Sequence, residues 1–579
     1  MIKALDNNRV IVGEKGHHQY DWSEGIQEKI TEFYFQLVRT KDAKDLNVKF
    51  CEILNTLSKD TIKYEKEIIL LYKITANTRD VKEGKGEMDL CWMQLLNWWK
   101  IKPELAYYLV DKILYMKGFH QYGSWKDIKY LCDYIYQETS DSQHAFIEYL
   151  IKLTNFYLRK LQYEKDNNSL KLLAKWIPRE KSKKFGWIFN RLAFDYNKKY
   201  LESSEKAKDP SKAAKKARHK CKMEYRKLIA KLNRDINTVQ INMCNGTWRA
   251  IKMKNITSKT MSKNREAFLN LKKEKYKYVE RSQEEDRKIC ATNLKNHLEL
   301  KKSGKADVKI NGQRCDLYEL VRDACVLERD GNQTLKDVIN AQWDDNRKNN
   351  FELGKIIPLV DVSGSMECDE AVPLYNAIGL GIRISEVTHP AFKNRIMTFS
   401  ANPTWLILND DMSFCEKVYK VRGAEWGMNT DLYKSFRAIL DVIKRNEIPP
   451  DDVKDITLAI FSDMQIDQAI GQKEFSVVYD NIKQMFEVAG LESKYKVPYE
   501  TPHILFWNLR KTNGFPSNTT QKNTTMLSGY NSSLLNIFQE KGVSELQKVT
   551  PIVMLNDLLD KDRYAILENG LKSLFEKEY

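Results

Sequence analysis

Three short polar segments lie in the C-terminal part of the chain, and two of them follow apolar runs. Asp361-Val-Ser363-Gly-Ser365 comes directly after the run Ile356 to Val360. Gly427-Met-Asn-Thr430-Asp431 adds a hydroxyl before a predicted helix, and Phe461-Ser-Asp463 adds a second carboxylate. Carboxylate and hydroxyl oxygens are hard ligands that suit magnesium or manganese. In parallel α/β sheets the carboxyl ends of the strands lie at one rim, and ligands bind there. We therefore expect the three segments to lie on this rim.

This three-loop set resembles the metal-ion-dependent adhesion site of von Willebrand factor A domains. In that site two serines and a threonine bind the ion, and aspartates act directly or through water. The resemblance implies the metal ligands Asp361, Ser363, Ser365, Thr430 and Asp463. The alternative is a vestigial loop that only caps the helix beginning near Asp369, where Glu367 and Asp369 add negative charge. Asp431 is expected to be the N-cap of the following helix and not a ligand.

No catalytic base accompanies these loops. The histidines nearest in sequence are His389 and His503, so hydrolysis by a general base is unsupported and we expect a protein that is not an enzyme. An ion with an open coordination position would instead accept a carboxylate or phosphate oxygen of a partner. Glu83-Gly-Lys-Gly-Glu87 lacks the spacing and the preceding strand of a phosphate-binding P-loop. A metal-dependent nuclease would need a second carboxylate cluster, which the sequence does not show.

The elements that must position these loops begin at about residue 350, where strand and helix patterns alternate. This alternation predicts a doubly wound, Rossmann-like parallel α/β domain over residues 350–579. The predicted strands are 355–360, 395–399, 456–461, 503–509 and 524–527, and the predicted helices are 371–386, 431–445, 474–489 and 531–540.

The preceding part, residues 1–349, has a helical pattern. Apolar residues recur at three- and four-residue spacing from about Trp22 to Tyr200, in segments of 12–20 residues separated by Gly and Pro. Segment length suggests an α-solenoid of degenerate, HEAT-like helix pairs. Residues 202–220 are rich in Ala and Lys, which predicts an exposed helix or a mobile loop. Helices then resume and continue, through a polar stretch at 250–310, to about Asn349.

Length and charge support two such regions. A chain of 579 residues exceeds a single domain. Residues 351–579 carry 25 Lys and Arg against 31 Asp and Glu, whereas residues 1–350 carry 70 against 48, and residues 201–310 alone carry 30 against 13. This asymmetry favours a polyanionic partner, of which nucleic acid is the commonest in cells. The alternative is that the Lys-rich helices are only solvated.

Several strings together resemble the family of unknown function 2828, whose members are large proteins of plants, fungi and large DNA viruses. They are Asn77-Thr-Arg-Asp80-Val-Lys-Glu-Gly-Lys-Gly-Glu87, Gly123-Ser-Trp-Lys-Asp127, Ala174-Lys-Trp-Ile-Pro178, Asn429-Thr-Asp431, Phe461-Ser-Asp-Met464, Phe506-Trp-Asn-Leu-Arg510 and Ser528-Gly-Tyr530. They extend from about residue 65 to 540. Pro516-Ser517 departs from the Pro-Val expected there. That family is similar in layout to TROVE proteins, including the Ro autoantigen, in which helical repeats form a ring closed by a von Willebrand A domain and bind RNA.

The resemblance to TROVE proteins implies that the basic helical half binds RNA, as a component of a ribonucleoprotein. The residues expected to bind RNA are Arg79, Lys82, Lys85, Lys126, Trp248, Arg249, Lys252 and Lys254. The lysines and arginines would track phosphates along an electropositive face, and the Trp248 ring would stack a base. The alternatives are structural: Arg79-Asp80 as a buried ion pair, the glycines as turn residues, and the tryptophans as core aromatics.

The remaining sequence patterns indicate where in the cell the protein is located. No apolar run approaches the roughly 20 residues that cross a membrane, and the first 18 residues do not resemble a signal peptide, so we expect an intracellular, cytoplasmic protein. The ten scattered cysteines indicate reduced thiols, and His17-His18 is too isolated for a zinc site. Heavy use of Lys, Asn and Ile fits an AT-rich genome, viral or protist. For a viral protein, the alternative location is the virion, into which the protein would be packaged. The rival to RNA binding is a protein scaffold or assembly factor, in which the basic face meets an acidic protein and the metal site docks a partner.

Overall fold

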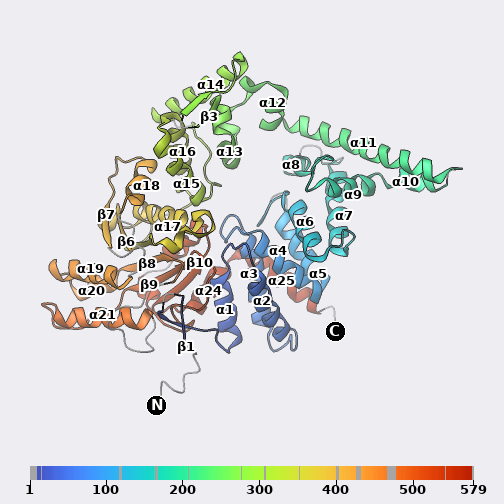
Figure 1. Ribbon diagram of the computed structural model, residues 1–579. Helices are drawn as coiled ribbons and strands as arrows, with labels where there is room; N and C mark the ends of the chain where they lie inside the picture. The colour runs from blue at the N-terminus through green and yellow to red at the C-terminus, as the bar shows by residue number, and fades with distance from the viewer. Residues whose placement is uncertain are drawn as a thin grey trace. The chain divides into compact units, whose positions relative to one another are not determined.

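Runs of β-branched, apolar and aromatic residues in the C-terminal half form a six-stranded sheet (Figure 1). Four strands are buried along their whole length, as expected where helices cover both faces. These four are β5 (Ile356–Asp361), β8 (Thr457–Ser462), β9 (His503–Asn508) and β10 (Thr524–Ser528). Two further strands, β6 (Arg395–Phe399) and β7 (Thr404–Ile407), complete the sheet. The computed structural model describes residues 10–14, 16–115, 120–161, 163–164, 167–206, 208–275, 277–304, 308–350, 352–399, 403–424, 432–465, 478–540 and 543–576.

The strand order is β10-β9-β8-β5-β6-β7, and every neighbouring pair is parallel except β6 with β7. The chain therefore starts at β5, proceeds outward to β7, and returns to the other side of β5 at β8. The order of the strands reverses between β5 and β8. In open α/β sheets, the crevice outside the carboxyl ends of the strands at such a reversal is where ligands bind.

The register aligns the ends of the central strands. Val360 of β5 lies opposite Phe461 of β8, which lies opposite Trp507 of β9, which in turn lies opposite Leu527 of β10. The next residue of each strand is polar and fully buried: Asp361, Ser462, Asn508 and Ser528. A row of buried polar side chains thus marks the carboxyl rim of the sheet.

Helices cover both faces of the sheet. α17 (Cys368–Val387) packs so closely that a Cβ at Gly381 would lie 2.4 Å from Cγ2 of Val360. The neighbouring residue Leu359, which points to the opposite face, belongs to a hydrophobic core with α19 (Leu432–Arg445) and α21 (Val478–Glu492). Gly379 allows α15 (Leu317–Asp330) to approach the outer side of α17, with Leu317 Cβ 3.0 Å from where a Cβ would be.

The chain divides into two compact units. The first comprises Met1–Ile74, Glu83–Lys85 and Lys252–Asp562, and therefore contains the sheet together with segments from the N-terminal part. Its other described elements are β1 (Val10–Val12), β2 (His18–Tyr20), α1 (Ile26–Gln36), α2 (Lys44–Leu57), most of α3 (Glu65–Arg79), η3 (Met253–Asn255), α13 (Ser258–Phe268), β3 (Leu271–Glu274), β4 (Lys277–Glu280), α14 (Glu285–Lys302), α16 (Gln333–Arg347), η4 (Gly364–Glu367), η5 (Pro390–Phe392), α18 (Phe414–Arg422), α20 (Pro450–Lys454), η6 (Ser532–Asn536), α22 (Ile537–Glu540), α23 (Val543–Leu546) and α24 (Pro551–Leu559).

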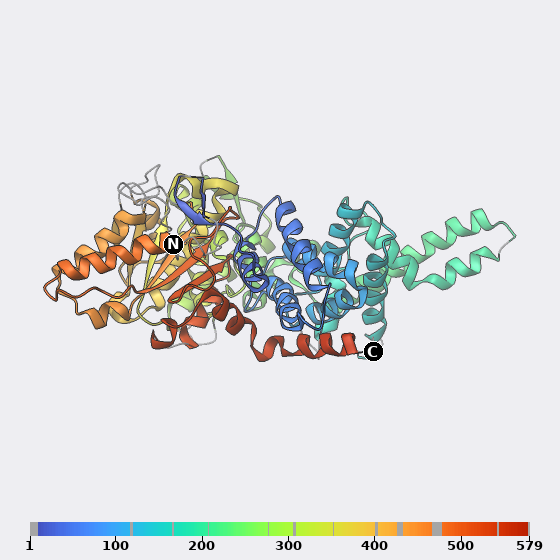
Figure 2. The same cartoon turned by 90° about the horizontal axis from the view of Figure 1, so that it is seen from below.

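The second unit comprises Thr75–Lys82, Gly86–Ile251 and Arg563–Tyr579, and its described elements are helices. Its helices are α4 (Asp89–Ile101), α5 (Pro103–Leu114), α6 (Asp127–Thr139), α7 (Ala145–Lys160), α8 (Asn168–Trp176), α9 (Gly186–Tyr196), α10 (Lys198–Glu205), α11 (Pro210–Ile236), α12 (Val239–Asn245), η2 (Trp248–Ala250) and α25 (Asp562–Glu576). Figure 2 shows α10 beside the first part of the long helix α11. Nothing in the described part of the chain is a helix long and apolar enough to cross a membrane.

The prediction of a helical N-terminal region followed by an α/β region is confirmed, with corrections. The sheet is mixed, because the edge strand β7 is antiparallel; its four residues gave too short a signal. α18, α24 and α25 were not predicted, and neither was the β3–β4 hairpin within the polar stretch. Residues 202–205 and 210–220 are helical, which matches the exposed-helix alternative. The expected boundary at 349/350 separates the two patterns in sequence, but it does not separate the two compact units.

Candidate metal centre and nucleic-acid interface

Asp361 ends β5 at the strand reversal and its side chain is fully buried. The Ser462 hydroxyl, at the end of neighbouring β8, donates to Asp361 Oδ2 at 2.6 Å, and the Ser363 backbone N–H donates to Oδ1 at 2.9 Å. Ser363 and Ser365 follow in the same loop, with their hydroxyl oxygens 3.1 Å apart. The structure thus brings together one carboxylate and the two predicted serine hydroxyls at the rim.

Asp463 follows β8 directly and is also fully buried. Its Oδ1 accepts a hydrogen bond from the Gln465 backbone at 3.1 Å, and its Oδ2 accepts one from Arg510 Nε at 3.0 Å. The same guanidinium donates from its second nitrogen to Glu14 Oε2 at 2.9 Å. Glu14 also donates its backbone N–H to the Gln465 side chain at 2.9 Å. Arg510 is therefore a protein cation held at one of the two predicted aspartate ligands.

The electrostatics of this rim favour a cation. Burial, and then repulsion from the Asp463 carboxylate, raise the pKa of Asp361 to about 7. Two buried carboxylates share the site while only Asp463 has a guanidinium partner, so ionised Asp361 is poorly compensated. A divalent cation would offset that charge, and the oxygen-only donor set is the chemistry that magnesium or manganese prefers. The residues present therefore fit such an ion.

The helix-capping alternative is less well supported by the geometry. The N-cap residues of η4 and α17, which are Ser363 and Glu367, make no side-chain capping hydrogen bond. After the loop, the backbone of Asp369, Glu370 and Ala371 is left-handed, with φ of 48°, 64° and 60°. Thr430 and Asp431 lie outside the described residues. Among those that are described, no group of three or more His, Cys, Asp or Glu is arranged to hold a metal, so this candidate depends on its hydroxyl oxygens.

Three residues of the rim were not predicted as part of it: Ser462, Gln465 and Arg510. Ser462 and Gln465 flank the predicted Asp463, and alternation along β8 alone does not reveal that the Ser462 hydroxyl points to Asp361. Arg510 ends the Phe506-Trp-Asn-Leu-Arg string that carried the family resemblance. A positive charge two residues beyond a strand that ends at the same rim was the signal available for it.

The RNA-binding prediction for Arg79 is wrong in this structure, because the side chain is buried and not on a surface. Arg79 is 2% exposed and forms a two-pronged ion pair with Asp127, with Nε–Oδ2 and NH2–Oδ1 distances of 2.9 Å. The alternative interpretation, a buried ion pair between Arg79 and Asp80, named the wrong acidic partner. Asp80 instead binds the guanidinium of Arg563, with a 2.7 Å bond to Oδ1.

Lys85 is likewise buried, at 2% exposure, and does not line an outer face. Its Nζ donates to the carbonyls of Tyr34 at 2.9 Å and Leu37 at 3.1 Å, at the C-terminal end of α1, and to the Ser528 carbonyl at 3.1 Å. A cation at a helix C-terminus is stabilised by the last carbonyls and by the helix dipole. Lys85 therefore joins α1 to the end of β10, and Gly529 lies directly beside it.

The other predicted RNA-binding residues differ in exposure. Trp248 is 8% exposed, so its ring is the anchor of its turn, as the structural alternative held, and is not presented for stacking. Lys82 and Lys126 are half-buried. Arg249, Lys252 and Lys254 are exposed, as an interface requires.

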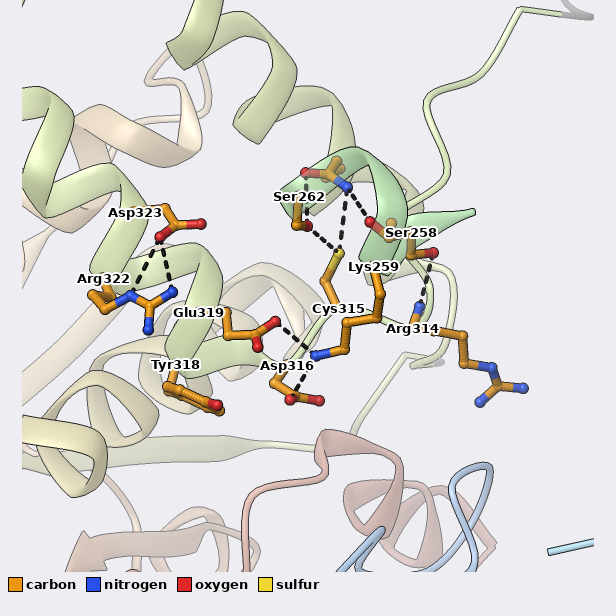
Figure 3. Close-up of polar contacts among 12 residues, drawn as sticks. Ser258, Lys259, Ser262, Arg314, Cys315, Asp316, Tyr318, Glu319, Arg322 and Asp323 are labelled. Atoms are coloured by element: carbon orange, nitrogen blue, oxygen red, sulfur yellow. Dashed lines mark hydrogen bonds and ion pairs between the residues drawn. The ribbon is translucent and has the colours of Figure 1, made fainter. Parts of the chain in front are cut away.

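Lys259, a few residues further, is held by two carboxylates of the first unit. Figure 3 shows its Nζ between Asp316, at 2.7 Å, and Glu319, at 2.6 Å. Although burial lowers the pKa of this ammonium, the two carboxylates raise it above its usual value. Nearby, the Arg322 guanidinium donates to Asp323 at 3.1 Å. Lys259 thus joins α13 to the start of α15, whereas Arg322 and Asp323 are neighbours within α15.

Comparison with known protein families follows the same division of the sequence. Residues 146–348 match the family model described as Domain of unknown function (DUF2828), and residues 355–564 match Domain of unknown function (DUF7788). The two matches follow one another along the chain and do not overlap. The predicted resemblance to family 2828 is confirmed for the helical part. The sheet, with its Asp361 loop, Asp463 and Arg510, lies within the DUF7788 match.

Two further similarities cover most of the chain. An uncharacterized protein, L728, of Acanthamoeba polyphaga mimivirus is 24% identical over 554 residues, which is 91% of this chain and 84% of that protein. The solved structure of the Deinococcus radiodurans RO (RSR) protein aligns over 89% of this chain and 99% of that one, at 12% identity and a TM-score of 0.35.

Proposed function

We propose that the protein is a non-enzymatic RNA-binding component of a ribonucleoprotein, with the DUF2828 domain as the RNA-binding part. The observation that carries this proposal is the distribution of charge. Residues 146–348 carry 49 Lys and Arg against 26 Asp and Glu, whereas residues 355–564 carry 23 against 27. A polyanion is attracted to the first domain and not to the second, and neutralising phosphates releases their condensed counterions.

Exposed side chains support the proposal. Arg249, Lys252 and Lys254 of the predicted set are exposed, whereas the buried Arg79 and Lys85 contribute to folding. A catalytic role gains no support from His503, which begins β9 and so lies at the opposite, amino end of the strands. The proposed role is therefore binding.

We further propose that the DUF7788 rim holds magnesium or manganese through Asp361, Ser363 and Ser365. Asp463, already bonded to Arg510, would act on the ion less directly, and Thr430 would supply the remaining predicted hydroxyl. When bound, the ion supplies an open coordination position for a carboxylate or phosphate oxygen of a partner. The chain itself orients this site, because the Ser462 hydroxyl and the Ser363 backbone fix the Asp361 carboxylate.

The test uses the full chain. Purified protein is first checked for a raised absorbance ratio at 260 nm over 280 nm, and labelled RNA is then titrated at increasing potassium chloride. RNA binding predicts a linear fall of log K with log salt, with a slope of about −0.7 per phosphate on single strands. If instead the protein binds no RNA, and an acidic protein from the same cells binds the basic domain, the scaffold alternative is correct.

A further inference from the structure

One face of α11 carries a continuous row of cations. Lys212, Lys216, Lys220, Lys227, Lys231 and Arg234 are all exposed. At 100° per residue they fall within a sector of about 100° on one side of the helix. The first and last are 22 residues apart, so the row extends about 33 Å at 1.5 Å per residue. We call this set the α11 basic face.

The opposite side of α11 fixes this face to the helical unit. Ala217, Cys221 and Tyr225 are buried. The Asn197 side chain donates to the Cys221 carbonyl at 3.0 Å, and the Tyr225 hydroxyl donates to Asn155 Oδ1 at 3.2 Å. Tyr225 also packs edge-on against Phe189 of α9, with ring centroids 5.5 Å apart. The helix is thus held from one side while the row of cations faces solvent.

The cations of this face are largely without acidic partners, unlike those around Lys259. Within the described residues, no carboxylate pairs with Lys212, Lys216, Lys231 or Arg234, and Lys220 lies over the Tyr200 ring, 4.2 Å from its centroid. Lys227 alone meets an acid, Glu224 at 3.3 Å, and both are well exposed, so that pair contributes little. Helix α11 has ten Lys and Arg against two acidic residues.

The chemistry of the face selects among polyanions. It presents no exposed aromatic ring, because the aromatic residue of α11, Tyr225, is buried, so it offers no stacking platform for unpaired bases. A membrane-binding helix needs an apolar face available for insertion, and that of α11 is already covered. A straight row of like charges about 33 Å long instead suits the regular phosphates of a nucleic-acid duplex, since it has the length of about ten base pairs of B-form DNA at 3.4 Å each.

We propose that the α11 basic face binds the phosphate backbone of a nucleic-acid duplex. This inference rests on the proposed RNA-binding function. It adds the place on the protein where the nucleic acid binds and the form of nucleic acid that binds there. Backbone contacts carry no direct sequence information, so the face should position duplexes of any sequence.

The test compares two full-length triple variants by fluorescence anisotropy. K216Q/K220Q/K231Q removes three charges from the α11 basic face, and glutamine keeps a helix propensity close to that of lysine. K444Q/K454Q/K494Q removes three lysines, one exposed and two half-buried, from the sheet-containing unit, where each has an acidic partner. The two variants thus have the same net charge. Circular dichroism confirms that both retain the wild-type helix content.

The probes are a labelled RNA duplex of roughly 20 base pairs, which exceeds the face, its single strand alone, and the matching DNA duplex. We expect the α11 variant to bind the RNA duplex at least tenfold more weakly, with a salt slope about 2.7 smaller, while the control variant stays within twofold of wild type. An equal loss on DNA duplex shows that the face reads the shared backbone, and a loss confined to RNA shows that it requires the A-form.

Other outcomes separate this inference from the function on which it rests. If wild type binds the duplex and the α11 variant binds it equally well, the α11 assignment is wrong while RNA binding survives. If the α11 variant loses only single-strand binding, the face is not a duplex site. If wild-type protein binds none of the probes, the proposed function fails first. Equal losses in both triple variants mean that only net charge matters, which also overturns the assignment.

Discussion

Arg510 donates from Nε to Asp463 Oδ2 across 3.0 Å, so a guanidinium of the chain occupies the side of the rim where a metal-binding aspartate was predicted. Asp361, one strand away, has hydroxyl and amide donors and no cation of the described chain bonded to it. The two carboxylates are therefore unequal: Asp463 is neutralised within the protein, and Asp361 is the carboxylate left for an external ion. A change at either residue should alter ion binding in a predictable direction.

Replacing Arg510 should strengthen ion binding. In R510Q the Asp463 carboxylate loses its cationic partner, so the rim gains negative charge and manganese affinity should rise roughly tenfold, or about 1.4 kcal/mol. Isothermal calorimetry on the full chain measures this. K511Q is the matched control, since it removes the neighbouring charge, which pairs with Asp45 at 2.7 Å, away from the rim. Equal affinities for wild type and R510Q would show that Arg510 does not compete with the ion.

Replacing Asp361 should have the opposite effect. D361N keeps the shape of the side chain and the acceptor for the Ser363 N–H, and its amide group would donate to the Ser462 hydroxyl, but it removes the charge. Manganese binding should therefore be lost while the fold is kept. Without metal at pH 8, D361N should unfold at a higher temperature than wild type, because a poorly compensated buried charge is gone. D369N, which removes an exposed acid from the following segment, should retain the ion. Undiminished manganese affinity in D361N would remove Asp361 from the ligand set.

The Arg79–Asp127 pair should act on stability and not on RNA. Removing one partner leaves a buried charge without compensation, which costs about 3–5 kcal/mol. R79M should therefore unfold at clearly lower urea concentration, and D127N should behave similarly. At a temperature where R79M is folded, its affinity for RNA should equal that of wild type. A selective loss of RNA affinity with unchanged stability would restore the original prediction that Arg79 contacts phosphate.

The sequence predicted the central strands because runs such as Ile356 to Val360 are continuously apolar, as buried parallel strands must be. It also placed Asp361 and Asp463 at one rim, because both follow such runs. It did not predict the composition of the two units, since the contacts that group residues 1–74 with the sheet leave no local periodicity.

Charge type did not reveal burial. Lys85 and Lys216 are both lysines in polar surroundings of the sequence, yet one is buried against helix carbonyls and the other faces solvent. The sequence feature that distinguishes the exposed lysine from the buried one is the spacing of cations along a helix. Cations of α11 recur at intervals that keep them opposite Cys221 and Tyr225, whereas Lys85 stands alone between two turn glycines.

Acid stability should depend on His503, which is fully buried at the start of β9 and bonds through Nε2 to the Thr525 hydroxyl at 2.9 Å. Burial lowers the pKa of His503 from 6.5 to about 4. Between these values the unfolded chain binds a proton that the folded chain does not, so stability is full above about pH 6.5 and is lost as the pH falls toward 4. The loss at pH 4 should be about 3 kcal/mol from this group. H503Q, which cannot be protonated, should be less stable than wild type at pH 8, and the difference should shrink as the pH falls. Denaturant titrations of both proteins at pH 8, 6 and 4.5 measure that difference, and a constant value across the range would show that His503 does not titrate as the structure indicates.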